Sequence, residues 1–320
     1  MLEAVAYLID ICGSLKTTER CLLIFDTSTK KLVPFFEKHA ENRGHTIDFV
    51  EIPVMTAHGQ EPPSNVSEMM LNYELVAGLT LMSLAHTRAR LAASKGGCRY
   101  LSLPEYTEKL LTSGVLFGVQ KNAWPRMQRF ADAFENGTVA KITTPLGTNL
   151  TLNIAGRSAN FCPGIVSAPG ELGSPPDMEV NISPLEFESQ GTLVIDGSIT
   201  HPSLGLLKTP VILTIKNGII TEIFSSDPNT MIKTEQIFLE VGDDKSRVLA
   251  ELGIGFNEEA CLNGSMLIDE GTSGYLHFGF GANHTVGGNN EVAFHIDFVM
   301  GNGCLEIDNV LMIKNGEFLI

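Results

Sequence analysis

The chain has 320 residues, 43% of them hydrophobic and 18% charged, with a formal net charge of −15. This length and apolar content predict about two globular domains with well-buried cores, and they exclude a disordered chain. The negative charge argues against nucleic acid or an anionic membrane as a partner, because neither would meet a basic surface. No apolar run approaches the ~18 residues of a membrane-spanning helix, and no signal peptide is recognisable.

The six cysteines are scattered along the chain and form no Cys-x-x-Cys pair; they lie at positions 12, 21, 98, 162, 261 and 304. This spacing is typical of reduced thiols, and it favours neither a disulfide framework nor a zinc knuckle. We therefore expect a cytoplasmic protein.

Residues 1–136 alternate helix-like and strand-like segments, with helices expected over 2–14 and 32–43 and strands over 21–26 and 47–52. The β-α-β order predicts an α/β domain with a doubly wound, mainly parallel sheet. Paired prolines indicate a loop over 58–67. Further on, the pattern predicts a strand over 99–104 and helices over 105–111 and 124–134.

Three polar residues stand close together in this half: His86, Arg88 and Arg90. The two guanidinium groups suit a substrate carboxylate, because their paired donors match its geometry. The same residues equally suit a solvated helix start. Both interpretations remain open from the sequence.

Residues 137–320 are rich in strand patterns, which predict an α+β domain with a largely antiparallel sheet. Segments 139–144 and 150–154 read as one hairpin, and the Asn217-Gly218 and Asn315-Gly316 pairs are strong turn signals.

The chemistry concentrates between Glu251 and Asp297. Residues 293–299 are dominated by β-formers, so His295 and Asp297 would point to the same face of a strand. His277 lies on a second expected strand and could supply a third ligand to a cation. A buried His-Asp pair can also be purely structural.

Pro175 and Pro184 bound a segment that we expect to be a rigid loop carrying Glu179. A carboxylate there could reach the histidines, or it could simply be solvated.

The whole chain resembles the aminopeptidase T family of thermophile-type metallopeptidases. The resemblance rests on four segments: Pro-Asp-Met-Glu179-Val, Ala-Glu251-Leu-Gly-Ile-Gly, Gly-Tyr-Leu-His277-Phe-Gly-Phe-Gly and Phe-His295-Ile-Asp297. It implies that Glu179, Glu251, His277, His295 and Asp297 are the ligands of two divalent metal ions.

The resemblance also implies a homodimer and a small peptide substrate. One departure concerns catalysis, because His284 stands where the family has a tyrosine. In the implied peptidase, Glu179 or Glu251 bridges the ions or accepts a proton from water, and His284 or His86 assists the leaving amine.

The same fold family includes relatives similar to 2,5-dihydroxypyridine 5,6-dioxygenase, which hold one non-haem iron. In that alternative, His277, His295 and Asp297 form the iron triad, and His86 acts as a base on the substrate. Retention of both glutamates favours the hydrolase, with Zn, Co or Mn as the metal, whereas loss of the tyrosine favours the oxygenase. A metal-stabilised protein without turnover is a third possibility.

Overall fold

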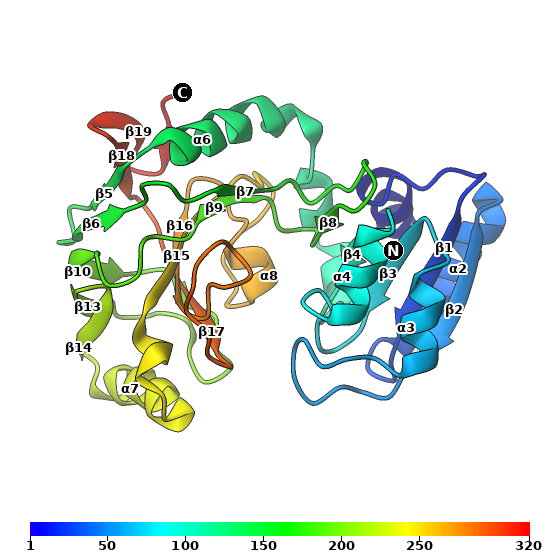
Figure 1. Cartoon of the computed structure of the whole chain (residues 1–320), viewed down its shortest axis with the longest axis horizontal. Helices are drawn as coiled ribbons and strands as arrows, with labels where there is room; N and C mark the ends of the chain where they lie inside the picture. Colours follow the sequence, from blue (N-terminus) through cyan, green and yellow to red (C-terminus); the bar gives the residue numbers. More distant parts are fainter. The chain divides into compact units, whose positions relative to one another are not determined.

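The computed structural model describes residues 1–320, which divide into two compact units. The first unit comprises Met1–Val119 and Cys162–Pro176, and the second comprises Gln120–Phe161 and Asp177–Ile320 (Figure 1). The sequence places a single boundary after residue 136. In the structure the chain leaves the first unit after Val119 and returns to it, because β8 (Leu172–Gly173) pairs with β4 (Arg99–Ser102) as a fifth parallel strand.

The first unit contains a five-stranded parallel sheet in the order β2-β1-β3-β4-β8, which confirms the predicted doubly wound class. Helix α1 packs against α2, and α3 packs against α4. β1 is buried along almost its whole length, as expected for a strand covered on both faces. The remaining elements are β1 Arg20–Phe25, β2 Thr46–Glu51, β3 Leu75–Leu79, α1 Leu2–Ala6, the π-helix η1 Tyr7–Cys12, η2 Lys30–Leu32, α2 Val33–Arg43, α3 Ser64–Met70, α4 Arg88–Lys95, α5 Glu108–Thr112 and η3 Val115–Gly118.

Two local expectations in this unit were wrong. Helix α3 begins at Ser64, inside the segment expected to be a loop, because the paired prolines precede the helix rather than exclude it. Helix α5 begins at Glu108 instead of residue 105. Glu105 has a left-handed backbone (φ 56°), and the side chain of Thr107 caps the helix by accepting from Leu110 N.

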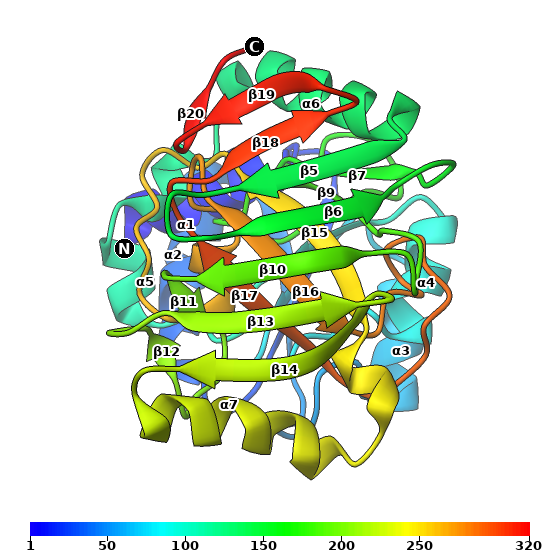
Figure 2. The same ribbon diagram turned by 90° about the vertical axis from the view of Figure 1, so that its left-hand side faces the viewer.

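The second unit contains two sheets that are largely antiparallel, as predicted. Figure 2 shows the eight-stranded sheet, in the order β14-β13-β10-β6-β5-β18-β19-β20, nearly face-on. The second sheet has the order β12-β11-β17-β16-β15-β9-β7. The strands are β5 Val139–Thr143, β6 Asn149–Asn153, β7 Ala159–Cys162, β9 Glu179–Ile182, β10 Gln190–Ile195, β11 Ser198–Ile199, β12 Gly205–Leu206, β13 Val211–Lys216, β14 Ile219–Ser225, β15 Leu249–Gly255, β16 Leu276–Gly281, β17 His295–Met300, β18 Cys304–Ile307, β19 Val310–Lys314 and β20 Glu317–Phe318.

The helices of this unit are η4 Lys121–Ala123, α6 Trp124–Asn136, α7 Pro228–Val241, η5 Asp244–Arg247 and α8 Met266–Asp269. Helix α7 lies along β14 at one end of the eight-stranded sheet (Figure 2). Both predicted Asn-Gly turns are confirmed. Asn217 and Gly218 join β13 to β14, and Asn315 and Gly316 join β19 to β20, each residue with positive φ.

The core of the second unit lies around β15 and β16, whose residues are all buried. Phe238 packs against Phe280 and Phe298 beside these strands. No helix of the structure is both long enough and apolar enough to cross a membrane. Because β15 and β16 are buried along their whole length, the seven-stranded sheet holds the side chains on β9, β15, β16 and β17 in fixed positions.

Candidate metal centre

Strand register brings the predicted ligands onto one face of the seven-stranded sheet. Glu251 on β15 lies opposite Gly279 on β16, and Gly279 in turn lies opposite Asp297 on β17. His277 on β16 lies opposite Gly253 on β15. Because side chains alternate along a strand, these positions share a face.

The two remaining predicted ligands, Glu179 and His295, also lie opposite residues of a neighbouring strand. His295 lies opposite Gly281, and Glu179 lies opposite Gly255 on β15. Every predicted ligand therefore faces a glycine on a neighbouring strand. A Cβ added at Gly253 would lie 1.9 Å from His277 Nε2, so this glycine leaves the space that the imidazole fills.

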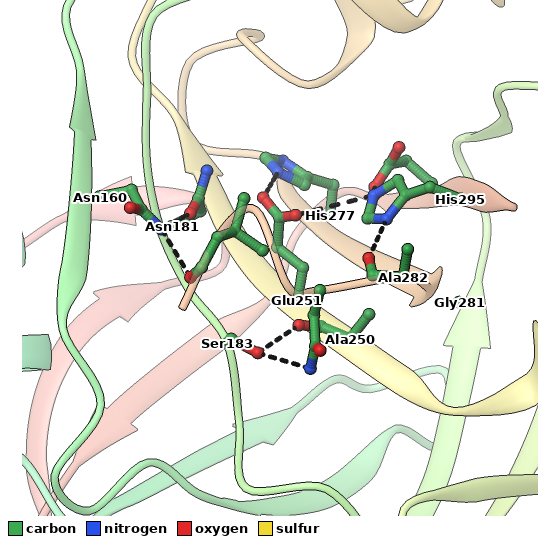
Figure 3. A network of polar contacts seen from close by, with 12 residues as sticks. Asn160, Asn181, Ser183, Ala250, Glu251, His277, Gly281, Ala282 and His295 are labelled. Atoms are coloured by element: carbon green, nitrogen blue, oxygen red, sulfur yellow. Dashed lines mark hydrogen bonds and ion pairs between the residues drawn. The ribbon is translucent and has the colours of Figure 1, made fainter. Parts of the chain in front are cut away.

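The side chains meet at short distances. His277 Nε2 lies 2.9 Å from Glu179 Oε2 and 3.7 Å from Glu251 Oε1. His295 Nε2 lies 3.3 Å from Asp297 Oδ1 and 3.7 Å from Glu251 Oε2. Glu251 thus presents one oxygen to each histidine, as Figure 3 illustrates.

Two sets of donor atoms converge, each within 4.8 Å: Glu179–Glu251–His277 and Glu251–His295–Asp297. The buried atoms Glu179 Oε2, His277 Nδ1 and His277 Nε2 make no aligned hydrogen bond. Unsatisfied buried polar atoms are costly, and a divalent cation would satisfy those that point into the cluster. Imidazole and carboxylate together suit zinc, cobalt, manganese or iron. The donor set therefore fits a metal.

Neighbouring groups orient these side chains. His295 Nδ1 lies 2.8 Å from Ala282 O, so a proton on Nδ1 leaves the Nε2 lone pair facing the cluster. Asn181 Nδ2 donates to Glu179 Oε1 at 2.6 Å. Asn160 Nδ2 in turn donates to Asn181 Oδ1 at 2.7 Å (Figure 3). Such outer contacts commonly fix the orientation of metal ligands.

The charges of the cluster shift its protonation strongly. Burial alone would lower the pKa of both histidines, but nearby carboxylates reverse this effect. Glu179 and Glu251 raise the pKa of His277 well above its ordinary value, and Asp297 and Glu251 raise the pKa of His295 to about 10. Burial would raise the pKa of Asp297, but the charge of His295 and its hydrogen bond lower it. In the metal-free protein these imidazoles carry protons that a metal must displace.

Three further residues belong to this cluster and were not predicted from the sequence: Asp177, Asn181 and Glu270. Burial, together with the charge of Glu179, raises the pKa of Asp177 well above its ordinary value. Burial and the charge of Asp297 do the same for Glu270. Asp177 and Asn181 stand two residues either side of Glu179, so strand alternation was the available signal. Glu270 offered none, because it ends the short helix α8 and belongs to no strand.

The prediction of a rigid loop around Glu179 was wrong. Glu179 begins strand β9, and Val180 pairs with Ile254 of β15. The buried apolar residues Val180 and Ile182 alternate with Glu179 and Asn181, and this alternation outweighs the flanking prolines.

The other predicted site residues lie outside these donor groups. His284 is exposed in the loop between β16 and β17. His86, Arg88 and Arg90 belong to the first unit, before and within the first turn of α4. The Arg88 side chain is 90% exposed and pairs with Glu61, which agrees with a solvated helix start, whereas Arg90 Nε donates to Ala85 O.

Comparison with known structures places the fold. The chain is similar to 2,5-dihydroxypyridine dioxygenase from Pseudomonas putida KT2440, with a TM-score of 0.83, 17% identity, and coverage of 99% of this chain and 96% of that one. It is also similar to wild-type AmpT from Thermus thermophilus, with a TM-score of 0.68, 13% identity, and coverage of 100% and 99%. These likenesses confirm the fold family that the sequence motifs indicated.

Comparison of the sequence with protein families shows which family the chain belongs to. None of the curated proteins matches the chain. The sequence model described as 2,5-dihydroxypyridine 5,6-dioxygenase matches residues 49–320, which is most of the chain. The chain therefore belongs to the 2,5-dihydroxypyridine 5,6-dioxygenase family.

Proposed function

We propose that this chain is a metal-dependent hydrolase that removes N-terminal residues from small peptides. Glu179, Glu251, His277, His295 and Asp297 would hold two divalent ions. The observation that carries this proposal is the shared position of Glu251, whose two oxygens face different histidines. A carboxylate placed in this way is suited to bridging two ions.

The grouping of the donors supports two ions over one. A single iron would use His277, His295 and Asp297, but these three are not among the sets whose donor atoms converge within 4.8 Å. Each set that does converge contains Glu251. In the one-iron arrangement Glu179 would not bind the metal, although its carboxylate is buried and accepts a hydrogen bond from Asn181.

The charge of the cluster supports a substrate with a cationic end. Five carboxyl groups, from Asp177, Glu179, Glu251, Glu270 and Asp297, act on one another across it. Bound divalent ions would displace protons from the carboxyl groups whose pKa is raised and would balance their charge. The remaining negative field would attract the free α-amino group of a peptide, which favours removal of the N-terminal residue over internal cleavage.

Bound divalent ions supply Lewis acidity, which polarises a carbonyl and lowers the pKa of water. Asn181 fixes Oε1 of Glu179, so Oε2 faces His277 and the donor cluster; either Glu179 or Glu251 would accept the proton from water there. Protonation of the leaving amine is assigned to His284, or to His86 of the first unit. Arg88 and Arg90 remain candidates for a substrate carboxylate, and the homodimer remains a prediction.

The test is hydrolysis of a dipeptide library by metal-loaded protein. Glu179→Gln should lower the rate by about 10²-fold or more, because the proton acceptor is lost. Glu222→Gln on β14, an exposed glutamate of the same unit, is the matched control and should retain full activity. A fully active Glu179→Gln variant would remove Glu179 from the mechanism.

A second candidate function is ring cleavage of a hydroxylated aromatic compound with one Fe(II). It is favoured by the family membership and by the likeness to the Pseudomonas dioxygenase. Here His277, His295 and Asp297 would hold the iron, and His86 would act as a base. Oxygen consumption with dihydroxypyridines, using protein purified and loaded with Fe(II) under anaerobic conditions, tests this alternative directly.

A further inference from the structure

The first unit contains its own convergent group of metal-ligand types. Donor atoms of Asp10, His39 and His45 lie within 4.8 Å of one another. Asp10 belongs to the π-helix η1, His39 to α2, and His45 to the segment between α2 and β2. None of these residues belongs to a motif that the sequence singled out. π-helical turns are rare and often occur at functional sites.

Local backbone structure assembles this group. Helix α2 ends at Arg43, and Gly44 adopts a left-handed conformation with φ 69°. The turn brings His45 back over the end of the helix, where its backbone N donates to Ala40 O. His39, in the second half of α2, and His45, just past its end, therefore both reach Asp10.

Both imidazoles converge on a single oxygen. Nε2 of His39 lies 2.9 Å from Asp10 Oδ1, and Nε2 of His45 lies 2.8 Å from the same atom. The side chains are only 5% and 4% exposed for the two histidines, and 15% for Asp10. His45 Nδ1 is also buried and makes no hydrogen bond.

A neutral His45 cannot satisfy this arrangement. With its proton on Nε2 it donates to Asp10 but leaves Nδ1 as a buried acceptor without a donor. With its proton on Nδ1, that N–H is a buried donor without an acceptor, and the Nε2 lone pair faces a carboxylate oxygen at 2.8 Å; a cation bound to both Nε2 and the oxygen would remove this repulsion. The second tautomer is the one that binds metal through Nε2.

We propose that Asp10 Oδ1, His39 Nε2 and His45 Nε2 form a binding site for a divalent transition metal of the zinc class, separate from the centre in the second unit. Two imidazoles and a carboxylate suit Zn²⁺ and its neighbours, whereas Mg²⁺ and Ca²⁺ prefer oxygen ligands alone. Such an ion would tie η1 to the end of α2.

Arg43 is compatible with this site. Its Nε donates to the other carboxylate oxygen, Oδ2, at 3.1 Å, so the contact orients Asp10 and leaves Oδ1 to the histidines. The Arg43 side chain is 61% exposed and is therefore well solvated. Asp10 and His45 line a surface hollow together with Thr17, Asn42 and Arg43, which gives an ion a path from solvent.

The test is zinc content after equilibrium dialysis of the full chain at a fixed free Zn²⁺ concentration, measured by elemental mass spectrometry. His45→Gln should bind one zinc fewer per chain than the wild type. Glu41→Gln is the matched control, because Glu41 lines a second hollow that His45 also borders, and the change removes a negative charge there without removing a donor of the proposed site. It should bind as many zinc ions as the wild type.

Equal zinc content in the wild type and His45→Gln would overturn the proposal, as would an equal loss in Glu41→Gln. Should His45→Gln fail to fold by circular dichroism, zinc-soaked crystals of the wild type give the answer. An anomalous zinc peak among Asp10, His39 and His45 supports the site, and no peak there overturns it. Neither readout depends on hydrolysis or on the centre in the second unit.

Discussion

Gly253 and Gly279 leave the space that the side chains of the candidate metal centre occupy. A Cβ at Gly279 would lie 2.7 Å from His295 Cε1 and 2.8 Å from Glu251 Cβ. A Cβ at Gly253 would lie 1.9 Å from His277 Nε2, the atom that points to Glu179. Glycine is unfavourable inside a strand, and its presence here is explained by the volume of the facing ligands.

Gly253→Ala should therefore displace the imidazole of His277 and weaken metal binding. The added methyl group overpacks a buried strand, so we expect a loss of about 1–3 kcal/mol in the free energy of unfolding. Zinc titration and thermal denaturation measure the two effects. Gly96→Ala at the end of α4 adds the same group at an ordinary φ of −77° and should change metal affinity little; unchanged zinc affinity in Gly253→Ala would contradict the account.

The raised pKa of His295 predicts a pH dependence in the metal-free protein. Its pKa is about 10 in the folded chain, compared with about 6.5 in an unfolded one. The stabilisation is therefore fully present below pH ~6.5 and is lost as the pH rises through about 10. Between pH 7 and 10, with chelator present, wild-type melting temperature should fall more steeply than that of His295→Gln. Parallel curves would show that the His295–Asp297 pair does not titrate in this way.

At the scale of the element, β9 illustrates what the sequence could and could not predict. Its prolines suggested a loop, although Val180 and Ile182 already alternate with polar residues. Alternation within β17 correctly placed His295 and Asp297 on one face. Pairing between strands had no local signal, so the facing glycines emerged only from the register. Glu270, which ends helix α8, had no strand pattern to reveal it.

Strand β9 also provides an orienting residue for the centre. Asn181→Ala removes the donor to Glu179 Oε1 without touching the carboxylate itself. Loss of such an outer contact typically lowers metal affinity by about 10–100-fold. Competitive titration with a zinc indicator measures this change, and Asn149→Ala on the exposed side of β6 is the control. Equal affinities for the two variants would mean that Asn181 does not position Glu179.

For the whole molecule, the α/β and antiparallel classes of the two units followed from the order and periodicity of the elements. The division between them did not, because residues 162–176 return to complete the parallel sheet through only two residues of β8. Such a short strand carries no periodicity that a sequence can reveal. The motifs pointed to the five candidate ligands, whereas the position of Glu251 between the two histidines depends on three strands at once.

The most direct test of the central claim is the number of metal ions held by the second unit. We would purify the chain without oxygen or added metal, in the His45→Gln background so that the first unit contributes none, and count ions by elemental mass spectrometry. We predict about two zinc, cobalt or manganese ions per chain, and at least one fewer after Glu251→Gln. One iron per chain that persists in Glu251→Gln would contradict the two-ion account and favour the dioxygenase.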